Sequence, residues 1–319
     1  MNEINSMRKK ISLIVPFYNE GETVFDFFNK LLPIINDLSQ YEFEFICIDD
    51  GSTDSTVANL LSLKDHRIKI IQFSRNFKKE AALTAGIDFA SGDAMIPIDA
   101  DLQDPPELIT EMLKKWEEGF EVVLAKRSDR STDPALKRIS ANLFYKVNNL
   151  LTDFTIPQNV GDFRLMDRVV IEALKQLPER QRFMKGLFAW VGFKTAMIEY
   201  KRESRVSGTT KWNKWRLWNF ALDGITSFSN TPLRIWSYIG IFFALIALVY
   251  GGWIALRVFL RGIDVPGYAS LLTAVLFLGG IQLISIGILG EYLGRTYQET
   301  KHRPIYIVRK FYNFEDFKK

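Results

Sequence analysis

The sequence predicts an α/β domain built on a mostly parallel β-sheet, followed by interface helices and two transmembrane α-helices. Two observations support this fold class. Up to Ala125, short apolar runs alternate with longer stretches whose apolar residues recur at helical spacing. Beyond residue 230, two apolar runs are each long enough to cross a bilayer. The chain of 319 residues therefore suits one catalytic domain with a membrane appendage.

The five expected strands are β-rich apolar runs: Ile11–Val15, Phe43–Ile48, Ile68–Phe73, Met95–Ile98 and Glu121–Ala125. The helices between them are expected at Val24–Leu38, from Thr53–Ser55 onward, at Lys79–Ala90 and at Pro105–Glu118, with a further helix at Pro134–Leu151. In the Pro105 helix, Asp104 has the position of an N-cap and Glu107 follows it by three residues. Strands alternating with helices favour a parallel sheet with right-handed crossovers.

The composition disfavours several classes of protein. The formal net charge is only +4, so we expect no general affinity for nucleic acid. The single cysteine, Cys47, lies in an apolar run, which excludes a disulfide framework and suits a reducing compartment. Arg8, Lys9 and Lys10 precede an apolar run that is too short for a signal peptide.

Polar, ionisable residues follow the end of every expected strand: Tyr18–Glu20, Asp49–Ser52, Ser74–Asn76, Asp99–Asp104 and Lys126–Arg127. The carboxyl ends of parallel strands share one edge of a sheet, and ligands bind at that edge. This edge would carry carboxylates and arginines rather than glycines. No G-x-G-x-x-G follows the first strand and no G-x-x-x-x-G-K-[ST] occurs, which disfavours a dinucleotide oxidoreductase and a P-loop NTPase.

Asp99 and Asp101 lie where a buried strand becomes a loop. In an extended chain, residues two apart share a face, so both carboxylates can point the same way. Two neighbouring carboxylates stay charged at low cost when a cation lies between them. A divalent metal that also bridges a diphosphate would meet that need. The alternative for an isolated Asp-x-Asp is a solvated acidic loop.

Four motifs together resemble those of family-2 glycosyltransferases with the GT-A fold: Val15–Glu20, Asp49–Ser52, Arg75–Glu80 and Asp99–Glu107. More narrowly, they resemble polyprenyl-phosphate glycosyltransferases, the family of dolichyl-phosphate mannose synthase and bactoprenol glucosyltransferases. The motifs occur in the family's order and cover the first third of the chain. The resemblance implies a nucleotide-sugar donor.

The same resemblance implies which residues bind that donor: Pro16, Tyr18, Glu20, Asp49, Asp50, Ser74, Asp99, Ala100, Asp101, Gln103 and Arg127. Pro16, Tyr18 and Glu20, with Asp49 or Asp50, would hold the base and ribose. Asp99 and Asp101 would hold Mg²⁺ or Mn²⁺ against the diphosphate, and Gln103 would line the sugar site. The alternative for Asp49–Ser52 is a turn followed by a helix cap.

The acceptor side is expected in the segment Asn159–Asp167, which resembles the family's acceptor segment and places Asp162 at its candidate catalytic carboxylate. A phosphate monoester has a second pKa of about 6, so an acceptor phosphate barely needs a base at neutral pH. Asp162 would therefore act as a base or orient the acceptor or a donor hydroxyl, with Arg164 as a possible partner.

Two further catalytic candidates, Arg205 and Lys211, belong to a segment that resembles the family's R-x-x-G-x-[ST]-K sequence. Cations there would lie between a dianionic acceptor and the diphosphate. The alternative is a basic loop attracted to anionic lipid. Gln181–Lys185 lacks the Arg and Trp of the Q-x-x-R-W signature of processive relatives, which favours a single transfer.

The membrane portion begins with Asn213–Asn230, where tryptophans beside lysines and arginines suit a helix in the membrane interface. Ile235–Leu260 and Ala269–Leu289 are the expected spans. Basic residues flanking this pair predict that the catalytic domain and both termini lie in the cytoplasm. The G-x-x-x-G pair at Gly290 and Gly294 would allow close helix approach in a homo-oligomer.

These observations predict domains at residues 1–210, 211–232, 233–295 and 296–319: catalytic, interfacial, transmembrane and a cytoplasmic tail. The expected activity is the inverting transfer of a hexose to polyprenyl (undecaprenyl) phosphate at the cell inner membrane. The expected hexose is glucose, and its expected donor is UDP-glucose. The alternatives are another donor, such as GDP-mannose, UDP-N-acetylglucosamine or an aminopentose, or a non-catalytic scaffold that binds a nucleotide sugar.

Overall fold

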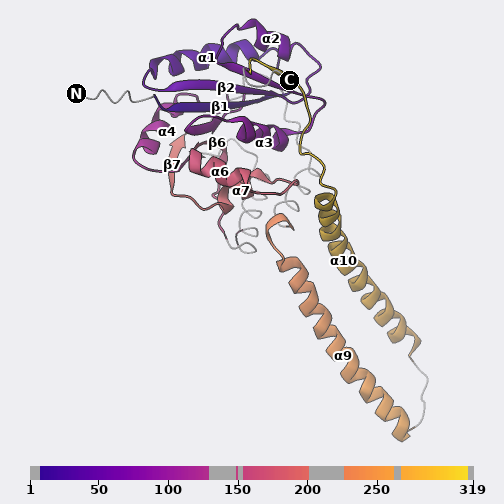
Figure 1. Cartoon of the computed structure of the whole chain (residues 1–319). Helices are drawn as coiled ribbons and strands as arrows, with labels where there is room; N and C mark the ends of the chain where they lie inside the picture. Colours follow the sequence, from indigo (N-terminus) through magenta and orange to yellow (C-terminus); the bar gives the residue numbers. More distant parts are fainter. Residues whose placement is uncertain (1–7, 129–148, 150–153, 201–225, 262–266, 315–319) are drawn as a thin grey trace. The chain divides into compact units, whose positions relative to one another are not determined.

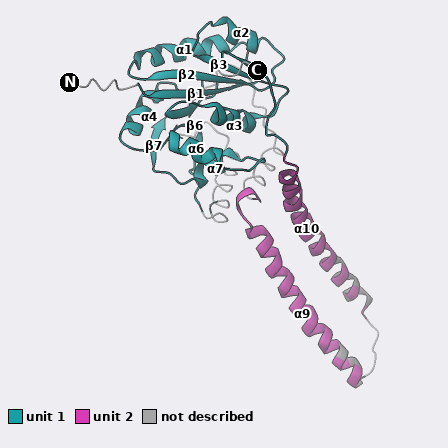
Figure 2. Ribbon diagram, in the orientation of Figure 1, with its two compact units in different colours: residues 1–218, 303–319 teal, residues 219–302 magenta. Residues whose placement is uncertain are grey.

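The computed structural model describes residues 8–128, 149, 154–200, 226–261 and 267–314. The chain divides into two compact units, residues 1–218 with 303–319 and residues 219–302 (Figure 2). The C-terminal segment thus belongs to the same unit as the sheet. The expected helix at 134–151, most of the expected interface helix and the candidates Arg205 and Lys211 lie outside the described residues.

The first unit is organised around a mixed sheet with the strand order β7-β5-β6-β4-β1-β2-β3-β8 among the described strands. The strands are β1 (Lys10–Phe17), β2 (Glu42–Asp49), β3 (Ile68–Phe73), β4 (Ala94–Pro97), β5 (Val122–Arg127), β6 (Val160–Asp167), β7 (Thr195–Tyr200) and β8 (Val308–Tyr312). The pairs β1–β2, β1–β4, β2–β3 and β5–β7 are parallel, which confirms a mostly parallel sheet. The pairs of β6 with β4 and β5, and of β8 with β3, are antiparallel.

The sheet has helices on both faces, so its central strands β1, β2 and β4 are buried along most of their length (Figure 1). The helices of this unit are α1 (Val24–Asp37), α2 (Thr56–Ser62), α3 (Lys79–Phe89), α4 (Leu108–Glu117), α6 (Arg168–Lys175) and α7 (Met184–Trp190). Leu13 and Val15 of β1 belong to the core that α1 and α4 complete. Ile14 points to the opposite face, where α3 packs against it at Gly86.

One sheet edge collects the polar segments that follow the strands. β5 runs in the same direction as β4, because each pairs antiparallel with β6. The carboxyl ends of β1 to β5 therefore lie at one edge, as predicted, and the amino ends of β6 and β8 join them there. The sequence analysis did not identify β6, β7 or β8 as strands.

The start of α4 differs from the prediction. The helix begins at Leu108, three residues later than expected, and Asp104 does not cap it. The side chain of Asp104 is instead buried and accepts a hydrogen bond from the hydroxyl of Tyr200 in β7. With Asp104 drawn inward, the chain passes through a turn at Pro105–Glu107, in which the Leu108 amide donates to the Pro105 carbonyl at 3.2 Å.

The second unit contains two long apolar helices, α9 (Thr231–Arg261) and α10 (Tyr268–Thr300), drawn in Figure 1. Within the described residues, the windows 231–254 and 277–300 have mean hydropathies of 1.9 and 1.4, and neither is buried. Long helices that are mostly apolar and yet exposed suit the hydrocarbon of a bilayer. Both expected spans fall within these helices.

Helix α7 receives its N-terminal cap from another helix. Its N-cap residue, Phe183, makes no side-chain capping bond, and Oε2 of Glu80 in α3 accepts the Met184 amide at 3.1 Å. Burial, together with the nearby Asp162 carboxylate, raises the pKa of Glu80 to about 7. This contact fixes α7, and hence Lys185, beside the start of β6.

Substitution of Gly86 by alanine tests the packing of α3 on β1. A Cβ there would lie 2.1 Å from Cγ2 of Ile14, so Gly86→Ala should destabilise the protein by about 1–3 kcal/mol. In an Ile14→Ala background, Gly86→Ala should destabilise the protein less, because the Cγ2 methyl of Ile14 that the new Cβ would meet is absent. Gly240→Ala, where a Cβ meets no atom within 4 Å, is the matched control. Thermal melting in detergent measures the wild type, the two single variants, the double variant and the control. Equal losses of stability from Gly86→Ala in both backgrounds would contradict the packing.

Substitution of Glu80 by glutamine tests the raised pKa. The folded protein keeps a proton on Glu80 between its ordinary pKa of 4.5 and about 7, whereas the unfolded chain has lost it. The stability that this proton confers is complete below pH 4.5 and is lost as the pH rises through 7. Glu80→Gln keeps an acceptor for Met184 without titrating. We expect it to gain about 1–3 kcal/mol relative to wild type between pH 5 and pH 8 in thermal melts. A pH-independent difference would argue against the shift.

Candidate active site

The loops after β2 and β3 are held together by Asp50 and Gly51. Asp50 is buried, and its carboxylate accepts the amides of Phe77 at 2.6 Å and Lys78 at 2.9 Å. Burial raises the pKa of Asp50 to about 6 and also raises that of Asp49. Gly51 has φ +72°, and a Cβ there would lie 2.4 Å from the Arg75 carbonyl carbon. Only glycine allows the two loops to touch in this way.

The loop after β1 presents Tyr18 beside them. Tyr18 is 42% exposed, and Asn19, with φ +53°, turns the chain directly after it. The Asn19 amide donates to Oγ of Ser52 at 2.9 Å, and Oδ1 of Asn19 accepts the Thr53 amide at 2.9 Å. These bonds bring the predicted base and ribose residues of β1 and β2 together.

Two other predicted donor-binding residues, one in β1 and one in the loop after it, have structural contacts. Pro16 lies within β1, paired with Ile48. The carboxylate of Glu20 accepts a hydrogen bond from Oγ1 of Thr23 at 3.2 Å.

The loop after β4 carries Asp99, Ala100, Asp101 and Gln103. Asp99 is about one-third exposed, and Oδ1 of Asp101 accepts the Gln103 amide at 3.2 Å. Leu102 has φ +56°, an uncommon conformation for a bulky residue and one that tends to occur at functional loops. Gln103 is only 6% exposed, and its Oε1 has no hydrogen-bond partner among the described residues.

Asp99, in the loop after β4, and Asp162, in the neighbouring strand β6, meet at one lysine. In the β4–β6 register, Ala94 pairs with Asp167 and Met95 with Met166; carrying it four residues further places Asp99 opposite Asp162. The ammonium of Lys79, the first residue of α3, lies 2.7 Å from each oxygen of Asp99 and 2.7 Å from Oδ2 of Asp162.

This cluster shifts the pKa values of Asp162 and Lys79. Burial alone would raise the pKa of Asp162, but Lys79, Lys185 and Arg164 outweigh it and hold the value well below the usual range. Burial alone would lower the pKa of Lys79, but Asp162 and Asp99 outweigh it and raise the value. Asp162 and Lys79 are therefore both charged at neutral pH. Lys79 is not among the site residues predicted from the sequence, although it lies within the Arg75–Glu80 motif.

The carboxylates of Asp99 and Asp101 suit a metal ion that binds together with a diphosphate. Among the described residues, no three His, Cys, Asp or Glu side chains form a cage for a metal. Mg²⁺ is commonly held by one or two carboxylates together with substrate phosphates, retaining several waters. Asp99 and Asp101 supply that number of carboxylates at the open edge of the sheet, so the residues present fit a divalent ion bound jointly with a diphosphate.

Arg127 and Ser74 complete the predicted set. Nε of Arg127 donates to the Tyr200 hydroxyl at 3.3 Å, and that hydroxyl in turn binds Asp104, so Arg127 is joined to the loop after β4. Ser74 lies at the end of β3, where its amide donates to the carbonyl of Ile307 at 2.9 Å, just before β8. Ser74 therefore contacts the C-terminal segment as well as adjoining the predicted site.

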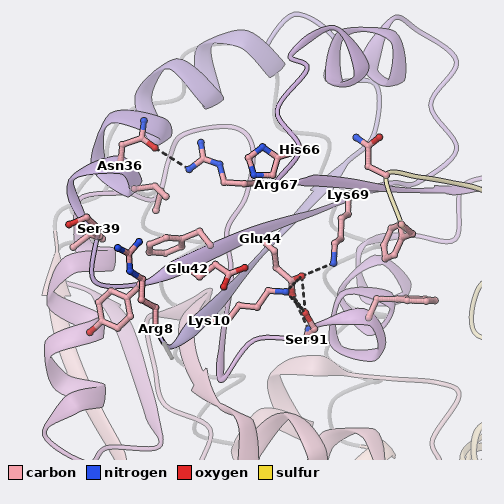
Figure 3. A pocket seen from close by; sticks show the side chains of 17 residues that line it. Arg8, Lys10, Asn36, Ser39, Glu42, Glu44, His66, Arg67, Lys69 and Ser91 are labelled. Carbon is pink, nitrogen blue, oxygen red and sulfur yellow. Dashed lines mark hydrogen bonds and ion pairs between the residues drawn. The ribbon is translucent and has the colours of Figure 1, made fainter. Parts of the chain in front are cut away.

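The larger of the two described hollows, of about 740 Å³, lies at the opposite edge of the sheet (Figure 3). Glu44 at its floor accepts hydrogen bonds from Ser12, Ser91 and Lys69 and lies 3.1 Å from the Lys10 ammonium. Although burial alone would raise it, these hydrogen bonds lower the pKa of Glu44 to about 2. The charges of this hollow join β1, β2 and β3 to one another, so they have a structural role.

Comparisons with known proteins agree with this arrangement. The family model "Glycosyl transferase family 2" matches residues 12–175, and "GtrB C-terminal hairpin" matches residues 231–296. A prophage bactoprenol glucosyl transferase homolog of Escherichia coli is 54% identical over 94% of this chain and 99% of its own length. The bactoprenol glucosyl transferase of Shigella phage SfV is also 54% identical, over 94% and 98%.

An uncharacterised glycosyltransferase of Synechocystis is 52% identical over 97% of this chain and 98% of its own length. A mycobacterial protein of known crystal structure shares the fold, with a TM-score of 0.50 and 18% identity over 68% of this chain and 73% of that one. The sheet and these matches confirm the predicted GT-A fold. The chain belongs to glycosyltransferase family 2 and carries that family's catalytic domain ahead of a GtrB-type C-terminal hairpin.

Proposed function

We propose that this enzyme transfers glucose from UDP-glucose to a membrane-bound polyprenyl phosphate, with inversion at the anomeric carbon. The observation that carries the proposal is the convergence of Asp99 and Asp162 on Lys79. It joins the predicted donor-side carboxylate to the predicted acceptor-side carboxylate at the ligand-binding edge of the sheet. The relatives named bactoprenol glucosyl transferases, at 54% identity over nearly the whole chain, support glucose and a polyprenyl lipid as the substrates.

The donor would bind across the loops after β1, β2 and β4. Tyr18 offers an exposed ring on which a base can stack. Asp50 is already occupied by the amides of Phe77 and Lys78, so its contribution would be to shape the loop that receives the nucleotide. The unpartnered Oε1 of Gln103 would accept a hydrogen bond from a sugar hydroxyl.

Asp99 and Asp101 would hold Mg²⁺ or Mn²⁺ against the diphosphate. A bound metal ion of this kind neutralises the charge that develops on a departing diphosphate. The side chains of this chain would then have to place the donor and acceptor at the same sheet edge and hold them in line.

Asp162 would orient a donor hydroxyl, or the acceptor through the cations around it, rather than remove a proton from the acceptor. Its depressed pKa makes it a weak base, and a phosphate monoester with a second pKa of about 6 is already largely deprotonated at neutral pH. A phosphate oxygen would attack the anomeric carbon in one displacement, the bond to the diphosphate would break, and no glycosyl-enzyme would form. Arg205 and Lys211, outside the described residues, would attract the acceptor phosphate.

The hairpin would anchor the enzyme where its lipid substrate resides. The catalytic unit and both chain ends would lie in the cytoplasm, because basic residues gather before α9 and after α10. A soluble nucleotide sugar and a lipid that cannot leave the bilayer would then meet on the same face of the inner membrane.

Glucosyl transfer by purified full-length protein tests this function. With UDP-glucose, undecaprenyl phosphate and Mg²⁺, we expect a glucose-linked lipid to form, and EDTA should abolish it. Asp99→Asn should reduce the rate by about 10²-fold or more, because it removes a charge that binds the metal and diphosphate. Asp93→Asn is the matched control, since Asp93 is exposed before β4 and accepts the Lys10 amide.

The same assay with GDP-mannose, UDP-N-acetylglucosamine and an aminopentose donor would identify a different sugar. Donor binding without product from any of these donors would point to a non-catalytic scaffold and overturn the proposal.

Cysteine labelling tests the orientation. The native Cys47 is fully buried, so single added cysteines give a low background. Asp264→Cys, between the two spans, should react with a membrane-impermeant maleimide in cells whose inner membrane is intact. Ser39→Cys, on the exposed surface of the catalytic unit, should react only after that membrane is opened. The reverse pattern would place the catalytic unit on the other side.

A further inference from the structure

Lys79 is fully engaged by the two carboxylates that it joins. A lysine ammonium has three N–H donors and no acceptor. Three carboxylate oxygens lie 2.7 Å from the Lys79 nitrogen: both oxygens of Asp99 and Oδ2 of Asp162. The donors of Lys79 are therefore matched by these oxygens, and both oxygens of Asp99 face the same cation.

A divalent ion and Lys79 cannot hold Asp99 in this way at the same time. Mg²⁺ binds carboxylate oxygens at about 2.0–2.1 Å in near-octahedral geometry. An ammonium lying 2.7 Å from both Asp99 oxygens occupies the side from which such an ion would approach. Metal binding therefore requires Lys79 to give up at least one of these oxygens, and two cations held by the same carboxylate repel each other.

The Lys79 ammonium would still have a partner if it moved away from Asp99. It keeps its contact with Asp162, which is also attracted by Lys185 and Arg164. The donor's diphosphate would bring negative charge to the same edge and compensate the released N–H groups. A bare metal ion brings no such compensation.

We propose that Lys79 is a resident counter-cation that a divalent ion must displace from Asp99, so that the metal binds tightly only together with a nucleoside diphosphate. This inference rests on the proposed function for its ligand, a nucleotide-linked sugar. It makes Lys79 a positioning residue that couples metal binding to donor binding. Coupling of this kind is reciprocal: the diphosphate tightens metal binding by the same factor as the metal tightens diphosphate binding.

Mn²⁺ binding to the purified full-length protein, followed by electron paramagnetic resonance with and without UDP, tests the role of Lys79. In the wild type, UDP should tighten Mn²⁺ binding about tenfold or more, within the usual range of such couplings. Lys79→Met should bind Mn²⁺ alone about tenfold more tightly than the wild type and respond less to UDP, because the competing charge is absent.

Two variants serve as controls. Lys78→Met removes the same charge from the adjacent exposed side chain and should behave as the wild type. Lys79→Arg keeps the charge and should leave binding of Mn²⁺ alone weak. If Lys79→Met does not fold, as judged by its melting curve, Lys79→Gln replaces it, because glutamine can still donate to Asp162 without carrying a charge.

The outcomes separate this inference from the proposed function. If the wild type binds UDP with Mn²⁺ but the neutral variants bind Mn²⁺ alone no more tightly than the wild type, the role of Lys79 is overturned and the proposed function stands. If Lys79→Arg binds Mn²⁺ alone as tightly as the neutral variants, charge competition is overturned. If the wild type binds no UDP with Mn²⁺, the proposed function itself fails.

Discussion

The site depends on one electrostatic constraint: the carboxylate of Asp99, in the loop after β4, lies close to that of Asp162, in the adjacent antiparallel strand β6. Like charges directly opposite in such a pair are destabilising. Asp99 and Asp162 are nevertheless held together because the Lys79 ammonium lies between them, 2.7 Å from oxygens of both. Lys79 is the first residue of α3, and Gly86 lets this helix approach β1 so closely that a Cβ there would lie 2.1 Å from Cγ2 of Ile14.

Around this cluster, other acidic side chains stabilise the conformation of the loops. Asp50 holds two amides of the β3–α3 loop, and Asp104 is buried against Tyr200. The carboxylate oxygens that accept these hydrogen bonds are therefore not available to a ligand. Asp99 and Asp101, which we propose to bind the metal and the diphosphate, lie nearer the surface than these two buried acids.

Sequence reasoning succeeded where the signal is local. Apolar runs predicted the first five strands, and the polar residues after them predicted the edge. It failed where a residue from a distant segment forms the contact. Asp104 has the sequence pattern of a helix cap, but its carboxylate instead accepts a hydrogen bond from Tyr200, 96 residues later. Lys79 was missed because its partner Asp162 reaches Asp99 only through the antiparallel insertion of β6 between β4 and β5. The helical periodicity around Arg75–Glu80 cannot predict that Lys79 contacts both Asp99 and Asp162.

The same insertion limits what Asp162 can do. An antiparallel β6 begins at the ligand edge, so Asp162 arrives among Lys79, Lys185 and Arg164. Those cations keep it ionised, and an acid stabilised so strongly as its anion has little affinity for a proton. An acceptor that needs deprotonation would be served poorly by this site, whereas an acceptor that arrives as an anion needs only to be steered. The electrostatics of the cluster thus favour an anionic nucleophile such as a phosphate over a neutral hydroxyl.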